Sequence, residues 1–413
     1  MASTASNAPT TATMATTVSK PQRVLSVDVL RGLTIALMIL VNDPGDWKHV
    51  FIQLDHAEWN GLTLTDLVFP TFLFVVGVSM VFSFTARVAR GNCRKSLTGH
   101  VWARFAKLVI LALALNYFPR MHWQGMRLYG VIMRIALCSL IAGMVLVFTR
   151  NPKVLAVIVI VLLVGYWALL RFVPIPGVGV PTHGFPINDE VNNLTAFVDR
   201  WALVWQHKLF FGAGALYRKT SDPEGLLSTL PSVATTLIGA LIGLHFRRPE
   251  WQQGEAARLR MRGYLFGWGL MLVLAGGIWN NAFPMNKNLW TSSFVLVTAA
   301  AAMIALGIMS LLVDYRSQPW PTWLRVITWP WLVFGSNAIV AYTSSVVLVK
   351  ALIYIHHTGP DGKSVSLLSW LYKTVFAAHG STVWTSLAWA VCFVAVCFIP
   401  NWILWRKKIF VRM

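Results

Sequence analysis

Long apolar runs fill most of this chain, and short polar segments separate them. Several runs, such as 154–170 and 227–244, approach the roughly twenty residues that cross a bilayer as a helix. Lipid offers no partners to free backbone groups, so runs of this kind are stable only as helices. The pattern predicts an all-α, polytopic transmembrane helical bundle with about ten spans. The predicted spans are residues 25–42, 62–86, 102–118, 129–149, 154–173, 227–246, 263–282, 290–313, 330–354 and 384–405.

Two segments fall outside this pattern. Residues 1–22 are rich in Ser, Thr and Ala and lack an apolar centre, so a disordered tail is expected there and not a signal peptide. Residues 366–379 are apolar but short, which favours an interfacial or re-entrant segment. Residues 23–413 are therefore predicted to form one transmembrane domain in the lipid bilayer.

Composition and charge sharpen this picture. The chain is 56% hydrophobic and only 12% charged, about half the charged fraction that is usual in a soluble domain. Its net charge of +20 comes largely from Lys and Arg in alternate loops and at both ends. Such a distribution is typical of cytoplasmic loops and does not indicate nucleic-acid binding. Both termini are therefore expected in the cytoplasm.

The other set of loops is richer in acids and is predicted to face outward. It includes the first loop and the long loop 174–226. The short loop 118–129 fits less well, because it holds Arg120 and Arg127 and no acid. Most of the histidines also fall on this side, a mild hint that polar chemistry occurs there. No Walker loop, HExxH or paired CxxC is present, so neither ATP-driven transport nor a metal site is expected.

Candidate chemistry lies at the two ends of the first two spans. Asp28 and Arg31 share a helix face at the inner end of the first span, as a structural ion pair or as part of an anionic cofactor's site. At the outer end, Asn42 closes the first span. His56 lies just before the second span. Thr63 and Asp66 have capping-box spacing, and Asp66 is either a helix cap or a functional carboxylate about one turn into the membrane.

These stretches resemble a known family. The runs SVDVLRG and HAEWNGLTLTDLVFPTFLFVVGVS look like the start of the heparan-α-glucosaminide N-acetyltransferase family and its bacterial relatives, within the broader transmembrane acyltransferases. The later stretches that fit are GVIMRIALC, VPIPGVG, NNLTAFVDR, DPEGLLSTLPS, NKNLWTSSFVL and Gly335-Ser336-Asn337-Ala338. The resemblance spans most of residues 24–405. One departure is Met133, where the family usually has Gln, so one polar pocket contact is in doubt.

The resemblance implies a specific reaction. Family enzymes take acetyl-CoA on the cytosolic side and deliver the acetyl group to the amine of a terminal glucosamine across the membrane. The family's catalytic histidine matches His56, and an asparagine implicated with it matches Asn42. The large luminal N-terminal segment of the animal enzyme has no counterpart here, so a bacterial inner-membrane protein is expected.

The chemistry of the residues is compatible with that reaction. N-acetylation needs a base to free the amine's lone pair, and donors for the tetrahedral oxyanion. His56 can be the base, or can itself carry the acetyl group. Asp66, Asp55 or Glu58 can orient it, and Asn42 can donate to the oxyanion. The basic inner loops suit CoA phosphates, with Arg31, Arg104 and Lys107, beside Asp28, as candidate cofactor contacts.

Further polar residues are candidate acceptor contacts, and each also has a structural explanation. Arg134 lies in an apolar stretch and must be paired or face a cavity. Glu224 can cap a helix or hold the sugar amine. Lys287 and Asn288 can bind substrate oxygens, although a lysine at a span end also snorkels. Asn337 can join helices, and Trp59 can stack on a sugar.

Two rival functions remain open at this point. A transporter for amino sugars or their oligosaccharides would also place Asp66, Arg134 and Asn337 within the membrane. An O-acyltransferase acting on an envelope glycan would use the same fold and histidine, because function lives in the site. The sequence does not decide the oligomeric state, and a homodimer is one option.

Overall fold

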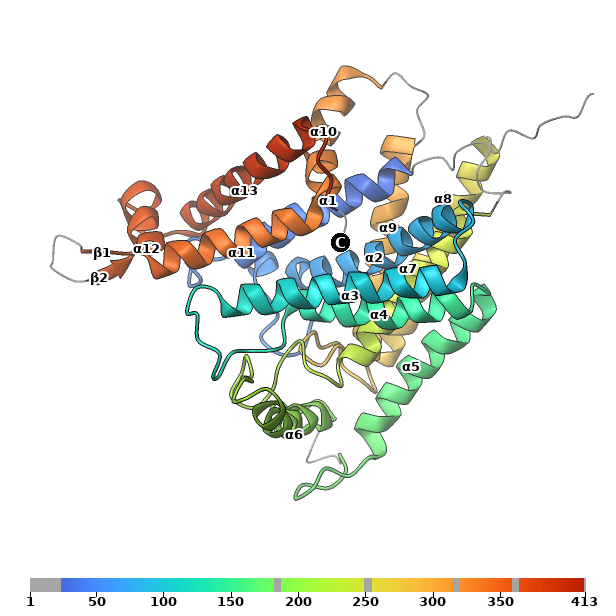
Figure 1. Cartoon of the computed structure of the whole chain (residues 1–413), viewed down its shortest axis with the longest axis horizontal. Helices are drawn as coiled ribbons and strands as arrows, with labels where there is room; N and C mark the ends of the chain where they lie inside the picture. The colour runs from blue at the N-terminus through green and yellow to red at the C-terminus, as the bar shows by residue number, and fades with distance from the viewer. Residues whose placement is uncertain (1–23, 182–186, 249–254, 315–319, 359–363, 412–413) are drawn as a thin grey trace, which may run out of the picture.

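Helices make up most of the described chain, and strands only a small part of it (Figure 1). The computed structural model describes residues 24–181, 187–248, 255–314, 320–358 and 364–411. The predicted tail 1–22 lies outside these residues. The α-helices are α1 (Leu25–Asn42), α2 (Leu64–Val88), α3 (Arg94–Tyr117), α4 (Val131–Phe148), α5 (Pro152–Phe172), α6 (Leu194–Leu209), α7 (Thr229–Phe246), α8 (Glu255–Trp279), α9 (Ser292–Met309), α10 (Thr322–Ser336), α11 (Ala338–Tyr354), α12 (Leu367–Leu371) and α13 (Val383–Arg406).

Three short helical turns and one hairpin complete the part of the fold that the structure describes. A 3₁₀ turn, Ile52–Leu54, lies between α1 and α2. The π-helical turns Ser310–Asp314 and Tyr372–Phe376 extend α9 and α12. Strands β1 (His356–Thr358) and β2 (Ser364–Ser366) pair antiparallel, with His357 opposite Val365.

The prediction of about ten spans is confirmed. Among the described residues, 9 helices are long and apolar enough to cross a membrane. The pair α10 and α11, bent by 80° at the break between them, makes ten if it is counted as one span. The side on which each loop lies is still a prediction. Three of the spans begin eight residues earlier than predicted, with α3 starting at Arg94, α8 at Glu255 and α10 at Thr322. In α3 and α8, polar first turns continue the helix beyond its apolar run.

The innermost helices are α1, α2 and α7, and α3, α5, α8 and α13 lie around them (Figure 1). Most of the apolar stretch of α2 is buried (78%), against 22% in α3, so α3 lies on the outside of the bundle. The α2–α7 and α1–α10 pairs approach closely at glycines. A Cβ on Gly77 would lie 1.9 Å from the Thr236 carbonyl oxygen, and one on Gly32 would lie 1.7 Å from that of Trp331. Small residues allow such contacts between membrane helices.

The predicted continuous span 330–354 is broken in the structure. Asn337 has non-helical backbone angles between α10 and α11. Its side chain donates to the Ile409 carbonyl (3.1 Å) and accepts from the Val411 amide (2.8 Å), so the C-terminal segment satisfies the buried amide. The broken helix leaves the Gly335 carbonyl free to accept from Arg31 (2.8 Å). Polar groups inside a membrane protein require such partners.

The long loop predicted at 174–226 contains a helix, α6, which lies beneath the bundle in Figure 1. Asn193 caps this helix by accepting from the Ala196 amide (2.8 Å). The segment after α6 pairs with the loop before α4, through Gly125 to Gly212 (2.8 Å) and Gly214 to Met126 (2.8 Å). These contacts build one wall of a cavity at the end of the bundle where α1 ends and α2 begins, here called the cavity end.

Candidate active site

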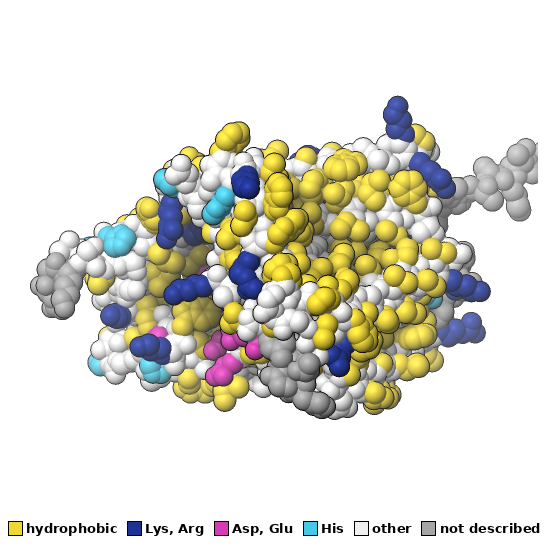
Figure 2. Space-filling model, turned by 90° about the horizontal axis from the view of Figure 1, so that it is seen from below, with side chains coloured by type: hydrophobic (Ala, Val, Ile, Leu, Met, Phe, Trp, Pro, Cys, Tyr) yellow, Lys and Arg dark blue, Asp and Glu magenta, His cyan; other side chains and the backbone are white. Residues whose placement is uncertain are grey.

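A cavity of about 330 Å³ opens at the cavity end. This volume is at the lower end of the range for small-molecule sites. Its lining residues come from six separate parts of the chain: Met38, Val41, Asn42, His56, Ala57, Thr65, Val68, Phe69, Arg127, Val131, Tyr217, Arg218, Pro223, Glu224, Lys287 and Asn288. The face that carries α6 shows acidic side chains gathered beside basic ones at a hollow (Figure 2). The cavity therefore brings together five predicted site residues, Asn42, His56, Glu224, Lys287 and Asn288.

His56 is paired with the carboxylate of Asp66. The Nδ1 of His56 lies 2.8 Å from Oδ1 of Asp66, which is fully buried. The other carboxylate oxygen accepts from the amides of Ala57 and Thr63, each at 3.1 Å. The predicted Thr63–Asp66 capping box is thus present, and it presents the carboxylate to the histidine. With Nδ1 donating to Asp66, Nε2 is the ring nitrogen that carries a lone pair.

Lys287 completes a compact group with this pair. Its Nζ lies 2.9 and 3.0 Å from the two ring nitrogens of His56, and 3.5 Å from Oδ1 of Asp66. Burial lowers the pKa of Lys287 below its usual range, opposed by the charges of Asp66 and Glu224. Asp66, His56 and Lys287 therefore form a triad of acid, imidazole and amine on the cavity wall.

Two amides hold the Lys287 loop against the segment that carries His56. The buried Asn286 donates to Oδ1 of Asn60 (3.2 Å) and accepts from the Leu289 amide (2.9 Å). The Gly61 amide donates to the Met285 carbonyl (2.9 Å). These contacts join the HAEWNGLT and NKNLW stretches, which are far apart in the sequence, into one surface.

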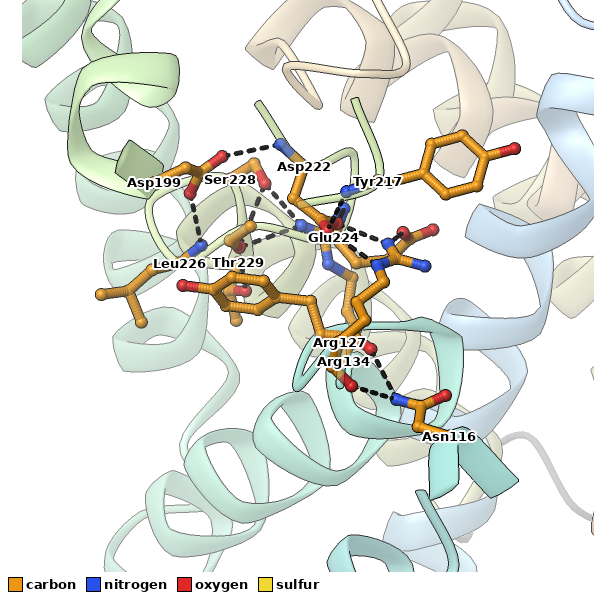
Figure 3. Close-up of polar contacts among 12 residues, drawn as sticks. Asn116, Arg127, Arg134, Asp199, Tyr217, Asp222, Glu224, Leu226, Ser228 and Thr229 are labelled. Atoms are coloured by element: carbon orange, nitrogen blue, oxygen red, sulfur yellow. Dashed lines mark hydrogen bonds and ion pairs between the residues drawn. The ribbon is translucent and has the colours of Figure 1, made fainter. Parts of the chain in front are cut away.

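Arg127 lies on another part of the cavity wall. It belongs to loop 118–129, the basic loop that fitted the predicted charge pattern poorly, and its charge is balanced by acids of another loop. Arg127 makes a two-pronged contact with Asp222 (2.7 and 2.5 Å) and reaches Glu224 (2.5 Å), as Figure 3 shows. Burial disfavours the guanidinium, but the Asp222 hydrogen bonds and both carboxylate charges raise the pKa of Arg127 above its usual range. Sequence reasoning missed Arg127 as a site residue, although the acid-free loop was a signal.

Two buried residues support the turn that carries Asp222 and Glu224 (Figure 3). Asp199, on α6, accepts from the amides of Asp222 and Leu226, each at 3.1 Å, and burial raises its pKa to about 6. Arg134, on α4, donates to the Gly225 carbonyl (3.2 Å) and to the Ser228 hydroxyl, and lies 5.0 Å from the Trp290 ring centre. Arg134 thus holds the turn and does not line the cavity.

The remaining acceptor candidates have other contacts. The Asp55 carboxylate accepts from the backbone amide of His56 (2.7 Å), not from its ring. Glu58 is exposed and outside the cavity lining. Trp59 donates to the Asn188 carbonyl (2.7 Å), and Arg218 lies over its ring at 5.3 Å. One face of Trp59 is therefore covered by a cation. Asn337 lies at the α10–α11 break and not at the cavity.

The candidate cofactor residues lie toward the other end of the bundle. Arg31 donates to Asp28 (2.6 Å), to the Gly335 carbonyl and, more weakly, to Ser79 (3.4 Å). Arg104, on α3, is within electrostatic range of Arg31, and its Nε has no partner among the described residues. Lys107 is exposed on the same helix. At ~1.5 Å per residue, Arg31 lies roughly 16 Å along α1 from Asn42. An elongated acetyl donor is long enough to contact both Arg31 and the cavity at Asn42.

Comparisons with known proteins agree with the motifs that build this site. A family model for the heparan-alpha-glucosaminide N-acetyltransferase catalytic region matches residues 23–263. The human heparan-alpha-glucosaminide N-acetyltransferase is 27% identical over 363 residues, 78% of this chain and 52% of the human protein. The mouse protein of that name is 28% identical over 372 residues, 80% of this chain and 54% of its own length. The chain spans about half the length of these relatives. It belongs to the heparan-alpha-glucosaminide N-acetyltransferase family.

Proposed function

We propose that this protein is a transmembrane acetyltransferase that moves an acetyl group from cytosolic acetyl-CoA to the amine of a glucosamine-type sugar on the outer side. The observation that carries the proposal is the His56–Asp66 pair on the wall of a cavity of ligand size. Family membership supports the reaction class, because both relatives are named as glucosaminide N-acetyltransferases.

In this mechanism His56 acts through Nε2. Asp66 accepts from Nδ1, orients the ring and stabilises the imidazolium that forms when Nε2 takes a proton from the attacking amine. The same nitrogen can instead attack the thioester and carry the acetyl group to the amine in a second step. Both routes need a neutral His56 whose ring is held by the buried Asp66. Both also need a cavity wide enough for the sugar amine.

The acceptor side of the cavity has a suitable polar lining. Glu224 is the cavity's acidic side chain among the described lining residues, so it is the proposed partner for the sugar ammonium. Asn288 and Asn42 offer amide donors and acceptors for hydroxyl groups or the reacting carbonyl. Arg127 and Asp199 fix the turn that carries Glu224 and are proposed to set its position.

The donor side is proposed at Arg31 and Arg104, with the exposed Lys107 nearby on α3. Guanidinium groups are suited to phosphate oxygens, and these helices begin in the loops predicted to be cytoplasmic. Asp28 would keep Arg31 in place through its 2.6 Å contact. The thioester would then reach the cavity from inside the bundle, close to Asn42 and His56.

A label-transfer assay tests this function. Purified protein in detergent is given acetyl-labelled acetyl-CoA with glucosamine, and label on the sugar is measured for the wild type, His56→Ala and His49→Ala. His49 is a matched control: it also pairs with an aspartate, Asp46, at 2.8 Å, but lies outside this cavity. We expect His56→Ala to lose at least the 10²- to 10⁴-fold that a general base contributes, and His49→Ala to retain activity.

Other outcomes would redirect the assignment. Full activity in His56→Ala would contradict the mechanism. Label on a glycan hydroxyl, but on no amine, would favour O-acylation. Uptake of labelled sugar into sealed vesicles without acetylation would favour transport. Size-exclusion profiles of all variants show whether a loss of activity reflects a loss of folding.

A further inference from the structure

We propose that the ammonium group of Lys287 stabilises the oxyanion that forms during acetyl transfer at His56. This inference rests on the proposed function and assigns a role to one residue within it. Its basis is the position of Nζ, 2.9 and 3.0 Å from the two ring nitrogens of His56, on the same cavity wall.

The chemistry of the step calls for a positive charge at this place. The amine nitrogen, or Nε2 in the two-step route, forms a bond to the thioester carbonyl carbon. The carbonyl π electrons move to oxygen. In direct transfer, the amine proton passes to Nε2 of His56. In the two-step route, the sugar amine later displaces the imidazole from the acetyl carbon, and its proton passes to the released Nε2. Collapse of the intermediate breaks the carbon–sulfur bond, and the CoA thiolate leaves and takes up a proton. A fixed donor beside the oxyanion lowers the barrier, and a charged one in a desolvated site does so most strongly.

Lys287 lies closer to the reacting nitrogen than any neutral amide whose contact is described. Asn42 lines the same cavity but has no described hydrogen bond to His56. The loop that carries Lys287 is held in place, because Asn286 and Met285 bind Asn60 and Gly61. The Nζ of Lys287 is held by the contacts with His56 and Asp66. A donor held in advance costs little reorganisation during the reaction.

Several charges control whether Lys287 is protonated. Burial disfavours the ammonium, whereas Asp66 at 3.5 Å and Glu224 across the cavity favour it. Arg127 and Arg218 also line the cavity and disfavour it, and His56 would do so once protonated. Burial prevails and lowers the pKa of Lys287, so the ammonium should be lost below the pH at which an exposed lysine titrates.

A neutral Lys287 would behave differently, and this gives a test that needs no variant. A free amine at this distance from His56 would compete with the sugar and become acetylated itself. We expect mass spectrometry of wild-type protein, incubated near neutral pH with labelled acetyl-CoA and no sugar, to find Lys287 unmodified. Stoichiometric acetylation of Lys287 would overturn the proposal, because acetylation converts the side-chain amine into a neutral amide that carries no positive charge.

Kinetics of Lys287→Met, Lys287→Arg and the exposed control Lys48→Met provide the second test. Lys287→Met should reduce kcat on the order of 10²- to 10³-fold, with a much smaller change in the KM for the sugar. The wild type should lose kcat as the pH rises through the lowered pKa of Lys287. Lys287→Arg should retain part of kcat and show no such alkaline loss, because arginine does not titrate there. Lys48→Met should match the wild type.

The outcomes separate this inference from the proposed function. If His56→Ala is inactive but Lys287→Met keeps full kcat, the acetyltransferase stands and the role of Lys287 is wrong. The role is equally wrong if Lys287→Arg retains the wild-type alkaline loss. If no variant and no wild-type protein transfers acetyl to any amine, the proposed function itself fails.

Discussion

At the scale of single residues, Asp66 joins the start of a helix to the candidate chemistry. One of its oxygens accepts from the Ala57 and Thr63 amides, and the other accepts from His56. The capping box fixes the carboxylate, and the carboxylate fixes the tautomer of the histidine. The helix-cap and functional interpretations of Asp66 are therefore compatible, because each uses a different oxygen.

Asp66→Asn tests this double role. The amide oxygen should keep the contacts to Ala57 and Thr63, so the amide NH₂ would face Nδ1 of His56. Nδ1 must then accept, and the ring proton moves to Nε2, which loses its lone pair. We expect the protein to fold while kcat falls by roughly 10²- to 10⁴-fold. Activity near the wild-type level in the label-transfer assay would show that the tautomer does not matter.

At the scale of elements, close helix contacts hold the cavity together. Helix α2 carries Asp66 at its start, and its middle lies against α7 at Gly77 and Gly239. A Cβ on Gly239 would lie 2.0 Å from the Phe74 carbonyl oxygen, a backbone atom that cannot move alone. The two helices must separate to admit a methyl group, although helix propensity by itself favours Ala over Gly.

Gly239→Ala should therefore destabilise the protein by about 1–3 kcal/mol, the usual range for overpacking. The control is Gly165→Ala on α5, where a Cβ meets nothing within 4 Å. The control should be neutral or slightly stabilising. Thermal unfolding in detergent, monitored by intrinsic fluorescence, compares the two. Equal midpoints for Gly239→Ala and Gly165→Ala would mean that the α2–α7 contact is looser than described.

At the scale of the whole molecule, the two ends of the bundle differ in chemistry. The cavity with His56 lies at one end, and the Arg31–Arg104 region lies toward the other. An acetyl donor that enters from one side of the membrane and a sugar acceptor that enters from the other would meet inside the bundle. The proposed function thus requires the orientation that the positive loops predict.

Native Cys93 tests that orientation. It is exposed just before α3, at the end opposite Lys48, which is also exposed. In intact cells that produce the protein, a membrane-impermeant maleimide should spare Cys93 and label it only after permeabilisation. A Lys48→Cys variant that also carries Cys93→Ser should be labelled in intact cells. The reverse pattern would invert the topology and exclude transfer from the cytosol to the outer side.

Sequence alone determined most of the helical spans and the family, and it predicted the histidine that lines the cavity. A run of apolar residues dictates a helix in lipid whatever surrounds it, because the backbone has no other partners. The capping spacing of Thr63 and Asp66 is equally local. These features depend on neighbours within a few positions, so the order of residues was enough to predict them.

Only the tertiary structure decided how distant segments meet. Lys287 reaches His56 across 231 positions, and Arg127 reaches Asp222 across 95. The break at Asn337 depends on the C-terminal segment that satisfies its amide. Glycine contacts, buried charges and loop pairings of this kind depend on which surfaces pack together. No local pattern specifies them, because each side chain's partner is provided by another part of the fold.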